Sequence, residues 1–401
     1  MNRLLCLTLL SLFACGKDTP AVPPDPPAPG DAAAAAPDAT SATSATDTAA
    51  TTATSPTTIG DAPRPRSEPP PRPPLPDGIK RFDKDVITLS LSGDGRYLAG
   101  GDLAGKSLLW DLESGRFLWG DPTPIGSRIG RVVFAEVGDI WVGGSFDEPD
   151  RPWRAWSATR LERRGEFGTA GEIAIDLALD KNGETAVVLT SSQDGERQIV
   201  SAWKLASDRP LWSAPALQSR RGAVAISPDG AQVAVSDDRG GLVRFGWPAP
   251  AGAAEPFVRT VLAEPSADAV PDRIARLAWL ESGPRAGLWA AQKAGLTRYL
   301  PTGDGGVSAP EPVVALEAGE AAGVTPIRGL HRISRGGETT LVAVTRPEAG
   351  GLVLWGLDGK VVGELVTDCR CETHALSFDG RVGACGCAPA SEIRYGAIRW
   401  R

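Results

Sequence analysis

The chain has 401 residues with a formal net charge of −7 at pH 7, and 42% of its residues are hydrophobic. It is therefore long enough to hold at least one large domain. The acidic balance argues against nucleic acid or anionic lipid as partners, since both need a basic protein face. The sequence contains no phosphate loop, zinc-protease motif or nucleophile elbow, and its only histidines are His331 and His374. We therefore predict no catalytic residue, no metal site and no cofactor.

The first 14 residues have the pattern of an export signal. A basic residue, Arg3, precedes an apolar run over residues 4–14 that is too short to span a bilayer. The run ends in LFACG at positions 12–16, which resembles the lipobox of bacterial lipoproteins. The resemblance implies cleavage before Cys15 and lipid attachment to its thiol, and Gly16 after it implies the outer membrane in a host that has two. The alternative is an ordinary signal peptide cut elsewhere.

Residues 15–77 consist of the cysteine that we expect to carry lipid, followed by a stretch rich in Ala, Pro and Thr. Such a composition buries too little apolar surface to offset the entropy of ordering the chain. We interpret this stretch as a disordered spacer that holds the following domain away from the membrane. Residues 78–401 form that domain.

Aromatic residues recur along this domain about every 42 to 56 residues, each after short β-type runs. A period of this length with four strands per unit is typical of a β-propeller blade. The sequence therefore predicts an all-β fold, a propeller of seven four-stranded blades. Large rings at the third strand of each blade are expected to fill the space between blades rather than to bind a ligand. The seven aromatic residues are Trp110, Trp156, Trp203, Phe245, Tyr299, Trp355 and Trp400.

The first unit carries the clearest motifs. A run over 86–92 leads into the turn Gly93-Asp94-Gly95, and a later run holds Trp110-Asp111. A Ser-x-Asp-Gly turn after the first strand and a Trp-Asp near the end of the third resemble the WD-repeat family. The other units repeat this plan in degenerate form, and the Gly-His pair of many WD repeats is absent. The resemblance implies a WD-like bacterial propeller without the hydrogen-bond network of that family.

The two ends of the domain are expected to close the ring together. Trp400 is taken as the third strand of the seventh unit, which then lacks a fourth strand, while residues 78–83 have no blade of their own. We predict that residues 78–83 form the outer strand of the seventh blade, because closure hides sheet edges. The alternative is an open or eight-bladed ring, with a missed unit in 248–272 or 301–326. We interpret both of those stretches as loops.

Four cysteines lie in the last unit as two Cys-x-Cys pairs, and alternate residues of a strand point to the same face. An exported protein meets an oxidising compartment, so we predict two disulfides. Bonding within one Cys-x-Cys is sterically poor, and of the two remaining pairings we favour the nested one. Zinc bound by the thiols with His374, or reduced redox-active thiols, are the alternatives. The four residues are Cys369, Cys371, Cys385 and Cys387.

No pattern identifies a ligand. We interpret the protein as a membrane-anchored interaction scaffold of the cell envelope, which faces the periplasm or the cell surface and binds an envelope protein that the sequence does not name. The alternative is a propeller enzyme, or a ligand- or metal-binding protein, that uses the central channel or the Cys-x-Cys pairs. Unpaired carboxylates at the mouth of the channel would favour this alternative, and a channel filled by apolar side chains would count against it.

Overall fold

Antiparallel strands build the whole of the domain that the computed structural model describes. The described residues are 78–81, 85–120, 128–145, 153–192, 194, 196–207, 209–248, 255–265, 274, 276–281, 283–292, 295–300, 310–315, 327–347, 350–387 and 391–401. The predicted signal peptide, Cys15 and the spacer lie outside them. Within these ranges no helix is long and apolar enough to cross a membrane.

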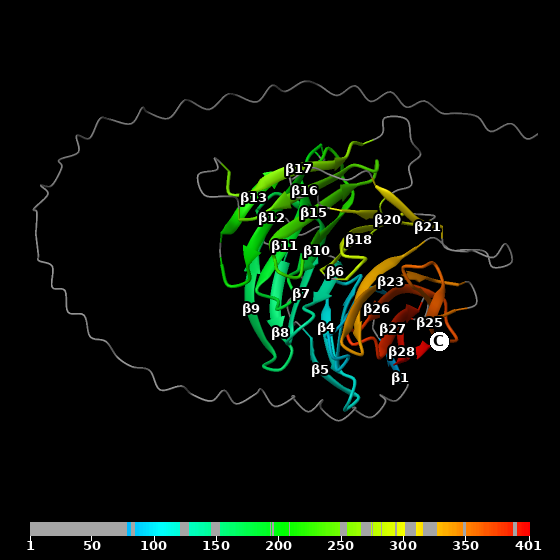
Figure 1. Cartoon of the computed structure of the whole chain (residues 1–401). Helices are drawn as coiled ribbons and strands as arrows, with labels where there is room; N and C mark the ends of the chain where they lie inside the picture. Colours follow the sequence, from blue (N-terminus) through cyan, green and yellow to red (C-terminus); the bar gives the residue numbers. More distant parts are fainter. Residues whose placement is uncertain are drawn as a thin grey trace, which may run out of the picture. The chain divides into compact units, whose positions relative to one another are not determined.

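The strands form seven antiparallel sheets arranged as the blades of a propeller (Figure 1), which confirms the predicted fold. Blade one contains β2 (Val86–Leu91), β3 (Tyr97–Asp102), β4 (Ser107–Asp111) and β5 (Arg116–Gly120). Blade two contains β6 (Ile129–Phe134), β7 (Ile140–Ser145), β8 (Trp153–Ser157) and β9 (Glu162–Phe167). Blade three contains β10 (Ile173–Leu179), β11 (Thr185–Ser191), β12 (Gln198–Lys204) and β13 (Pro210–Pro215). Blade four contains β14 (Gly222–Ile226), β15 (Gln232–Asp237), β16 (Leu242–Gly246) and β17 (Val258–Ala263).

The remaining blades follow the same order of strands. Blade five contains β18 (Arg276–Leu280), β19 (Gly287–Ala291), β20 (Gly295–Tyr299) and β21 (Glu311–Ala315). Blade six contains β22 (Gly329–Arg335), β23 (Glu338–Thr345), β24 (Leu352–Trp355) and β25 (Val361–Leu365), extended by the short β29 (Arg399–Trp400). Blade seven contains β26 (Cys371–Leu376), β27 (Val382–Cys387), β28 (Glu392–Ala397) and the early strand β1 (Gly78–Arg81).

Strand β1 closes the ring as predicted. It pairs antiparallel with β28, with Gly78 opposite Tyr395 and Lys80 opposite Ile393, so the first described segment supplies the outer strand of the last blade (Figure 1). The Lys80 ammonium also donates a 2.6 Å hydrogen bond to the Gly115 carbonyl of blade one. A β-carbon at Gly78 would overlap the Tyr395 ring, so this position needs glycine for close approach.

The prediction that Trp400 lies in the third strand of blade seven is wrong. The third strand is β28, and its aromatic residue is Tyr395. Trp400 instead follows in β29, opposite Gly363 at the outer edge of blade six. Its indole N–H donates to the Gly380 carbonyl at 2.7 Å, and the Arg335 guanidinium lies 4.2 Å from its ring centroid. Blade seven has short connections, so its third strand comes earlier than the average period suggests.

The interpretation of 248–272 and 301–326 as loops is also wrong in part. Each stretch contains the fourth strand of its blade, β17 in blade four and β21 in blade five. Both are outer strands, and β17 is largely exposed, so it lacks the buried apolar alternation by which a strand is recognised. Neither stretch adds a blade within the described part of the chain.

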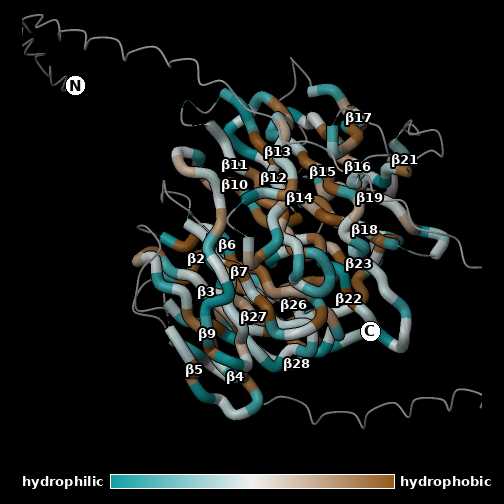
Figure 2. The backbone as a smooth tube through the Cα atoms, turned by 90° about the vertical axis from the view of Figure 1, so that its left-hand side faces the viewer, coloured by the Kyte–Doolittle hydropathy of each residue, from teal (hydrophilic) through white to brown (hydrophobic). Residues whose placement is uncertain are grey.

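Seven apolar clusters fill the seven junctions between neighbouring blades. At the junction of blades one and two, Trp141 and Trp156 stack with ring centroids 4.2 Å apart, and Trp119 meets both rings edge-on. Trp141 and Trp156 are fully buried, and the rings at most of the predicted third-strand positions are buried. Figure 2 shows hydrophobic segments along the strands and hydrophilic ones at the turns. The aromatic residues of the third strands therefore act mainly as wedges between blades.

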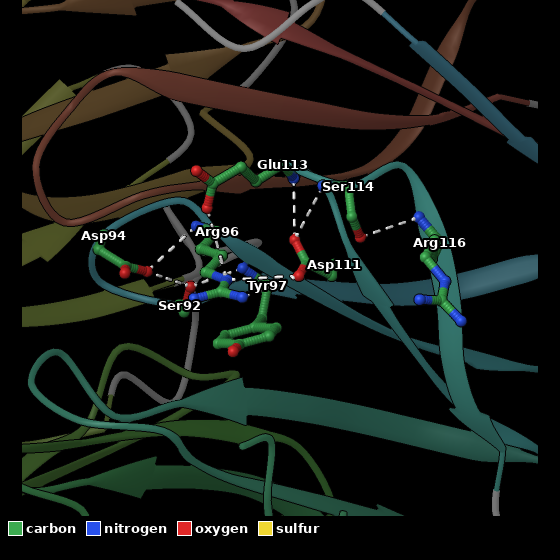
Figure 3. A network of polar contacts seen from close by, with 8 residues as sticks. All are labelled: Ser92, Asp94, Arg96, Tyr97, Asp111, Glu113, Ser114 and Arg116. Atoms are coloured by element: carbon green, nitrogen blue, oxygen red, sulfur yellow. Dashed lines mark hydrogen bonds and ion pairs between the residues drawn. The ribbon is translucent and has the colours of Figure 1, made fainter. Parts of the chain in front are cut away.

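The hairpin turns of blade one are held by a polar network (Figure 3). The Ser92 hydroxyl donates to Asp94, and the Arg96 guanidinium binds Asp111 at 3.0 Å. Asp111 also accepts the backbone N–H of Ser114. Burial opposes ionisation of Asp111, but these hydrogen bonds outweigh it and hold its pKa below the ordinary value. Asp111 thus stabilises the turn that follows β4, and its bond to Arg96 links this turn to the one between β2 and β3.

Loss of the closing strand should weaken the ring. Replacement of residues 78–81 in the full-length chain by four prolines removes the backbone N–H donors that pair β1 with β28, and we expect the free energy of unfolding to fall by about 2–4 kcal/mol. Urea denaturation followed by tryptophan fluorescence measures the change. The same replacement at residues 74–77 is the matched control. Equal stability of the two variants would contradict closure through β1.

Candidate functional site

A cavity of about 780 Å³ lies at the centre of the ring, lined by the first strand of every blade. These strands are β2, β6, β10, β14, β18, β22 and β26. Its volume is within the range of small-molecule binding sites. The cavity is therefore the candidate functional site.

Neighbouring first strands run side by side in the same direction. The backbone N–H of Val132 donates to the Thr88 hydroxyl at 3.0 Å, and that of Phe134 donates to the Ser90 hydroxyl at 2.9 Å. The two bonds join residues with the same offset along the chain, as a parallel alignment of β2 and β6 requires. Side chains at the beginning of the first strands therefore gather at one mouth of the cavity.

Arginines dominate that mouth. The cavity lining contains eight arginines, three carboxylates and no lysine. Arg346 follows β23 and donates a 3.0 Å hydrogen bond to the Cys371 carbonyl, which ties the mouth to the start of β26. Five further arginines are the first residue of a first strand or come one or two residues before it: Arg128, Arg220, Arg221, Arg276 and Arg328.

The three lining carboxylates do not balance this charge. Asp176 binds the Arg131 guanidinium at 3.0 Å and also accepts the backbone N–H of Val224 at 3.1 Å. Glu372 is exposed and lies 3.2 Å from the Arg370 guanidinium, which is not part of the lining. The lining therefore has an excess of positive charge, although the whole chain is acidic.

The opposite end of the cavity is crossed by an ion pair. Glu136 follows β6 of blade two, and its carboxylate binds the guanidinium of Arg332 on β22 of blade six. Blades two and six are not neighbours in the ring, so this bond spans the cavity. The Arg332 guanidinium also lies 5.5 Å from the Phe378 ring centroid. Burial raises the pKa of Glu136, and the positive charge of Arg332 opposes that rise.

The two histidines meet in the wall of the cavity. His331 on β22 and His374 on β26 contact edge to face, with ring centroids 5.1 Å apart. A β-carbon at Gly329 would overlap both Nε2 atoms, so glycine makes room for the pair. The His374 Nε2 atom is buried without a hydrogen-bond partner. Both histidines line the cavity, and both are half-buried.

Burial and neighbouring cations keep both imidazoles neutral at pH 7. Burial, with smaller effects from the positive charges of Arg131 and Arg276, lowers the pKa of His331 to about 3. Burial also lowers the pKa of His374 well below its ordinary value, with smaller effects from His331 and from Arg346. The pair therefore presents uncharged ring nitrogens among guanidinium groups.

The sequence analysis did not predict this basic cavity. The arginines come from different blades, so they are separated along the chain, and the net charge of −7 conceals them. One signal was present: an arginine occurs at the beginning of the first strand, or just before it, in units two, four, five and six. Alignment of the units would have placed these side chains at one mouth. The cavity is neither filled by apolar side chains nor ringed by carboxylates.

The four cysteines come together in blade seven as nested pairs. The structure joins Cys369 to Cys387 and Cys371 to Cys385, with Cα–Cα distances of 5.6 and 5.4 Å. A register shift between Cys371 and Thr373 supplies the irregularity that nested pairing needs beside a tight turn. The sulfurs of Cys369, Cys385 and Cys387 lie within 4.8 Å of one another, and that cluster does not include His374. The paired sulfurs link β26, which carries His374, to β27.

No protein-family model matches this chain, and no curated protein matches it in sequence. The architecture itself is plain. The chain contains a seven-bladed β-propeller. The features that bear on its function are the cavity, the cysteines and the surface of the described blades.

Two disulfides make a direct prediction about mass. Reduction of the purified protein should add about 4 Da to the peptides that span residues 369–387, because each disulfide takes up two hydrogens. Without reductant, iodoacetamide should label none of these four thiols, and this is the internal control. Four labelled thiols in the unreduced protein, or a zinc ion in the native mass spectrum, would contradict the disulfide pairing.

Proposed function

We propose that this protein is a lipid-anchored propeller of the cell envelope whose central cavity binds an anionic molecule. The observation that carries the proposal is the lining of the cavity, with eight arginines against three carboxylates. Arginine presents several donors in a planar fork that matches carboxylate and phosphate oxygens. Such a cluster creates a positive potential in the cavity, which favours a ligand of negative charge.

Export and anchoring are part of the same proposal and rest on the sequence. The lipobox-like residues 12–16 support lipid attachment at Cys15, and the composition of residues 16–77 supports a spacer. A degenerate WD-like origin is supported by the Trp110-Asp111 pair and by its turn. Gly16 supports a location on the outer membrane, in a host that has two membranes, where the protein would face the periplasm or the cell surface.

A scaffold role remains the second candidate. Large apolar side chains are exposed on outer strands, with Phe117 on β5 at 56% and Val258 on β17 at 47% exposure. Edge strands with exposed apolar residues are one means of binding a partner protein. Cross-linking on the native membrane, followed by mass spectrometry, tests this candidate. Cross-links from β5 or β17 to one envelope protein would support it, and cross-links to lipid or to many abundant proteins alone would count against it.

Lipid attachment makes a prediction about fractionation. Replacement of Cys15 by serine removes the acylated thiol, so we expect the full-length protein to move from the membrane fraction to the soluble fraction. Immunoblots of the two fractions measure the change. Cys6→Ser, which lies within the predicted signal, is the matched control and should leave the mature protein on the membrane. Membrane retention of the Cys15→Ser variant would contradict the anchor.

Anion binding makes a prediction about affinity. Pyrophosphate and citrate, as probes of the two oxyanion classes, should bind the full-length protein with a one-to-one stoichiometry at low salt in isothermal titration calorimetry. Arg276→Gln should weaken binding of the preferred probe by about tenfold to a hundredfold, because a hydrogen bond to a charged group contributes about 1.5–3 kcal/mol.

The matched control is Arg163→Gln on the exposed outer strand β9. It should leave the affinity within about twofold of that of the unaltered protein. Preference for pyrophosphate would indicate a phosphorylated ligand, and preference for citrate a carboxylated one. The proposal fails if neither probe binds, or if both substitutions weaken binding equally.

A further inference from the structure

The histidine pair lies where a ligand drawn in by the arginines would arrive. His331 and His374 line the cavity between the arginine mouth and the Glu136–Arg332 pair at the other end. The His374 Nε2 atom has no hydrogen-bond partner, and a buried polar atom without a partner costs about 1–3 kcal/mol. Because residue 329 is glycine, no β-carbon overlaps the two Nε2 atoms. One nitrogen of the pair, Nε2 of His374, therefore has no hydrogen-bond partner among the described protein groups.

The charges around the pair come from several blades, and most of them are positive. Strand β2 contributes only uncharged side chains to the lining, among them Thr88 and Ser90. The carboxylates are Asp176 on β10, Glu136 after β6 and Glu372 on β26, and the first two are bound by Arg131 and Arg332. The remaining lining cations are Arg128, Arg220, Arg221, Arg276, Arg328 and Arg346.

An anion among these groups would change the state of the imidazoles. Without an anion, a positive charge on either ring would be buried beside guanidinium groups. The rings therefore stay neutral. A bound oxyanion brings the opposite charge and can accept a hydrogen bond from each ring nitrogen that faces it. The protonated imidazole is then favoured, because an opposite charge within a few ångströms stabilises it.

We propose that His374 and His331 form the inner part of the anion site, and that an oxyanion bound there takes up a proton from solvent. This inference rests on the proposed function and adds the inner contact and its control by pH. The ligand class is a compact, multiply charged oxyanion, a phosphate ester or a polycarboxylate. A long polyanion threaded through the ring is disfavoured, since the Glu136–Arg332 pair crosses the far end.

The direction of the pH dependence follows from the number of protons bound by the free protein and by its complex with the anion. His331 without ligand has a pKa of about 3, so it binds no proton between pH 8 and 5. The anion raises this pKa, so below the new value the complex holds one proton more than the free protein. Affinity therefore increases as the pH falls, by up to tenfold per pH unit for one proton taken up.

Sulfate is the probe for this test, because it stays a dianion across the pH range used. Its affinity for the full-length protein is measured by calorimetry at pH 8, 7, 6 and 5, in buffers of different ionisation enthalpy that report proton uptake. We expect tighter binding at lower pH, with up to one proton taken up per sulfate. His374→Gln keeps a neutral donor, so it should bind within about twofold of the unaltered protein at pH 8 and lose most of the gain at pH 5.

Glu136→Gln is the matched control, because Glu136 also lines the cavity and burial raises the pKa of its carboxyl group. It should retain the pH dependence that His374→Gln loses. Imidazole NMR adds a readout that does not depend on affinity, because the chain has only two histidines and His331→Gln assigns the two signals. Sulfate at pH 6 should shift at least one ring toward the protonated form.

The outcomes separate the two proposals. Sulfate binding with an equal pH dependence in the unaltered protein, in His374→Gln and in His331→Gln, or with both rings still neutral by NMR, overturns the histidine inference and leaves anion binding in place. A pH dependence lost only in Glu136→Gln also overturns it. Failure of sulfate, pyrophosphate and citrate to bind at any pH overturns anion binding itself, and the histidine inference with it.

Discussion

The pairing of β1 with β28 is the contact on which the rest of the structure depends. It joins the first described strand to the last blade by backbone hydrogen bonds, so blade seven has four strands and lies between blades six and one. A ring closed in this way brings seven apolar junctions together and places the seven first strands around one space. Without closure, the cluster shared by blades seven and one would be exposed along one side.

The cavity follows from this geometry, and its chemistry follows from side chains that the ring collects. Arginines that are far apart in the chain meet at one mouth because five of them lie at the start of a first strand or just before it, and Arg346 follows β23. The nested cysteines hold β26 to β27, and Arg346 binds the carbonyl of Cys371 at the mouth. The strand that carries His374 is therefore fixed from both sides. A rigid wall of this kind suits a site that must keep like charges close together before a ligand arrives.

The acidic sequence and the basic cavity together indicate how a ligand would be selected. The net charge of −7 resists nonspecific binding of polyanions to the outer surface, while the enclosed arginines attract an anion small enough to enter. The Glu136–Arg332 pair limits passage through the ring, and the two histidines connect occupancy to proton binding. If both proposals hold, selection by size, charge and pH arises from this single cavity.

Sequence alone determined the blade plan, because the alternation of buried and exposed residues and the Gly/Asp turns are local properties of each strand and hairpin. It also indicated closure by residues 78–83, since one end of the domain had a strand without a blade and the last blade was expected to lack one. Tertiary structure decided the position of Trp400, because its place in β29 depends on the edge of blade six. It likewise decided the outer strands β17 and β21, which have little apolar signal of their own, and the arginine-lined cavity. A site assembled from single residues on several blades is not local in the chain, so only the closed ring brings its charges together.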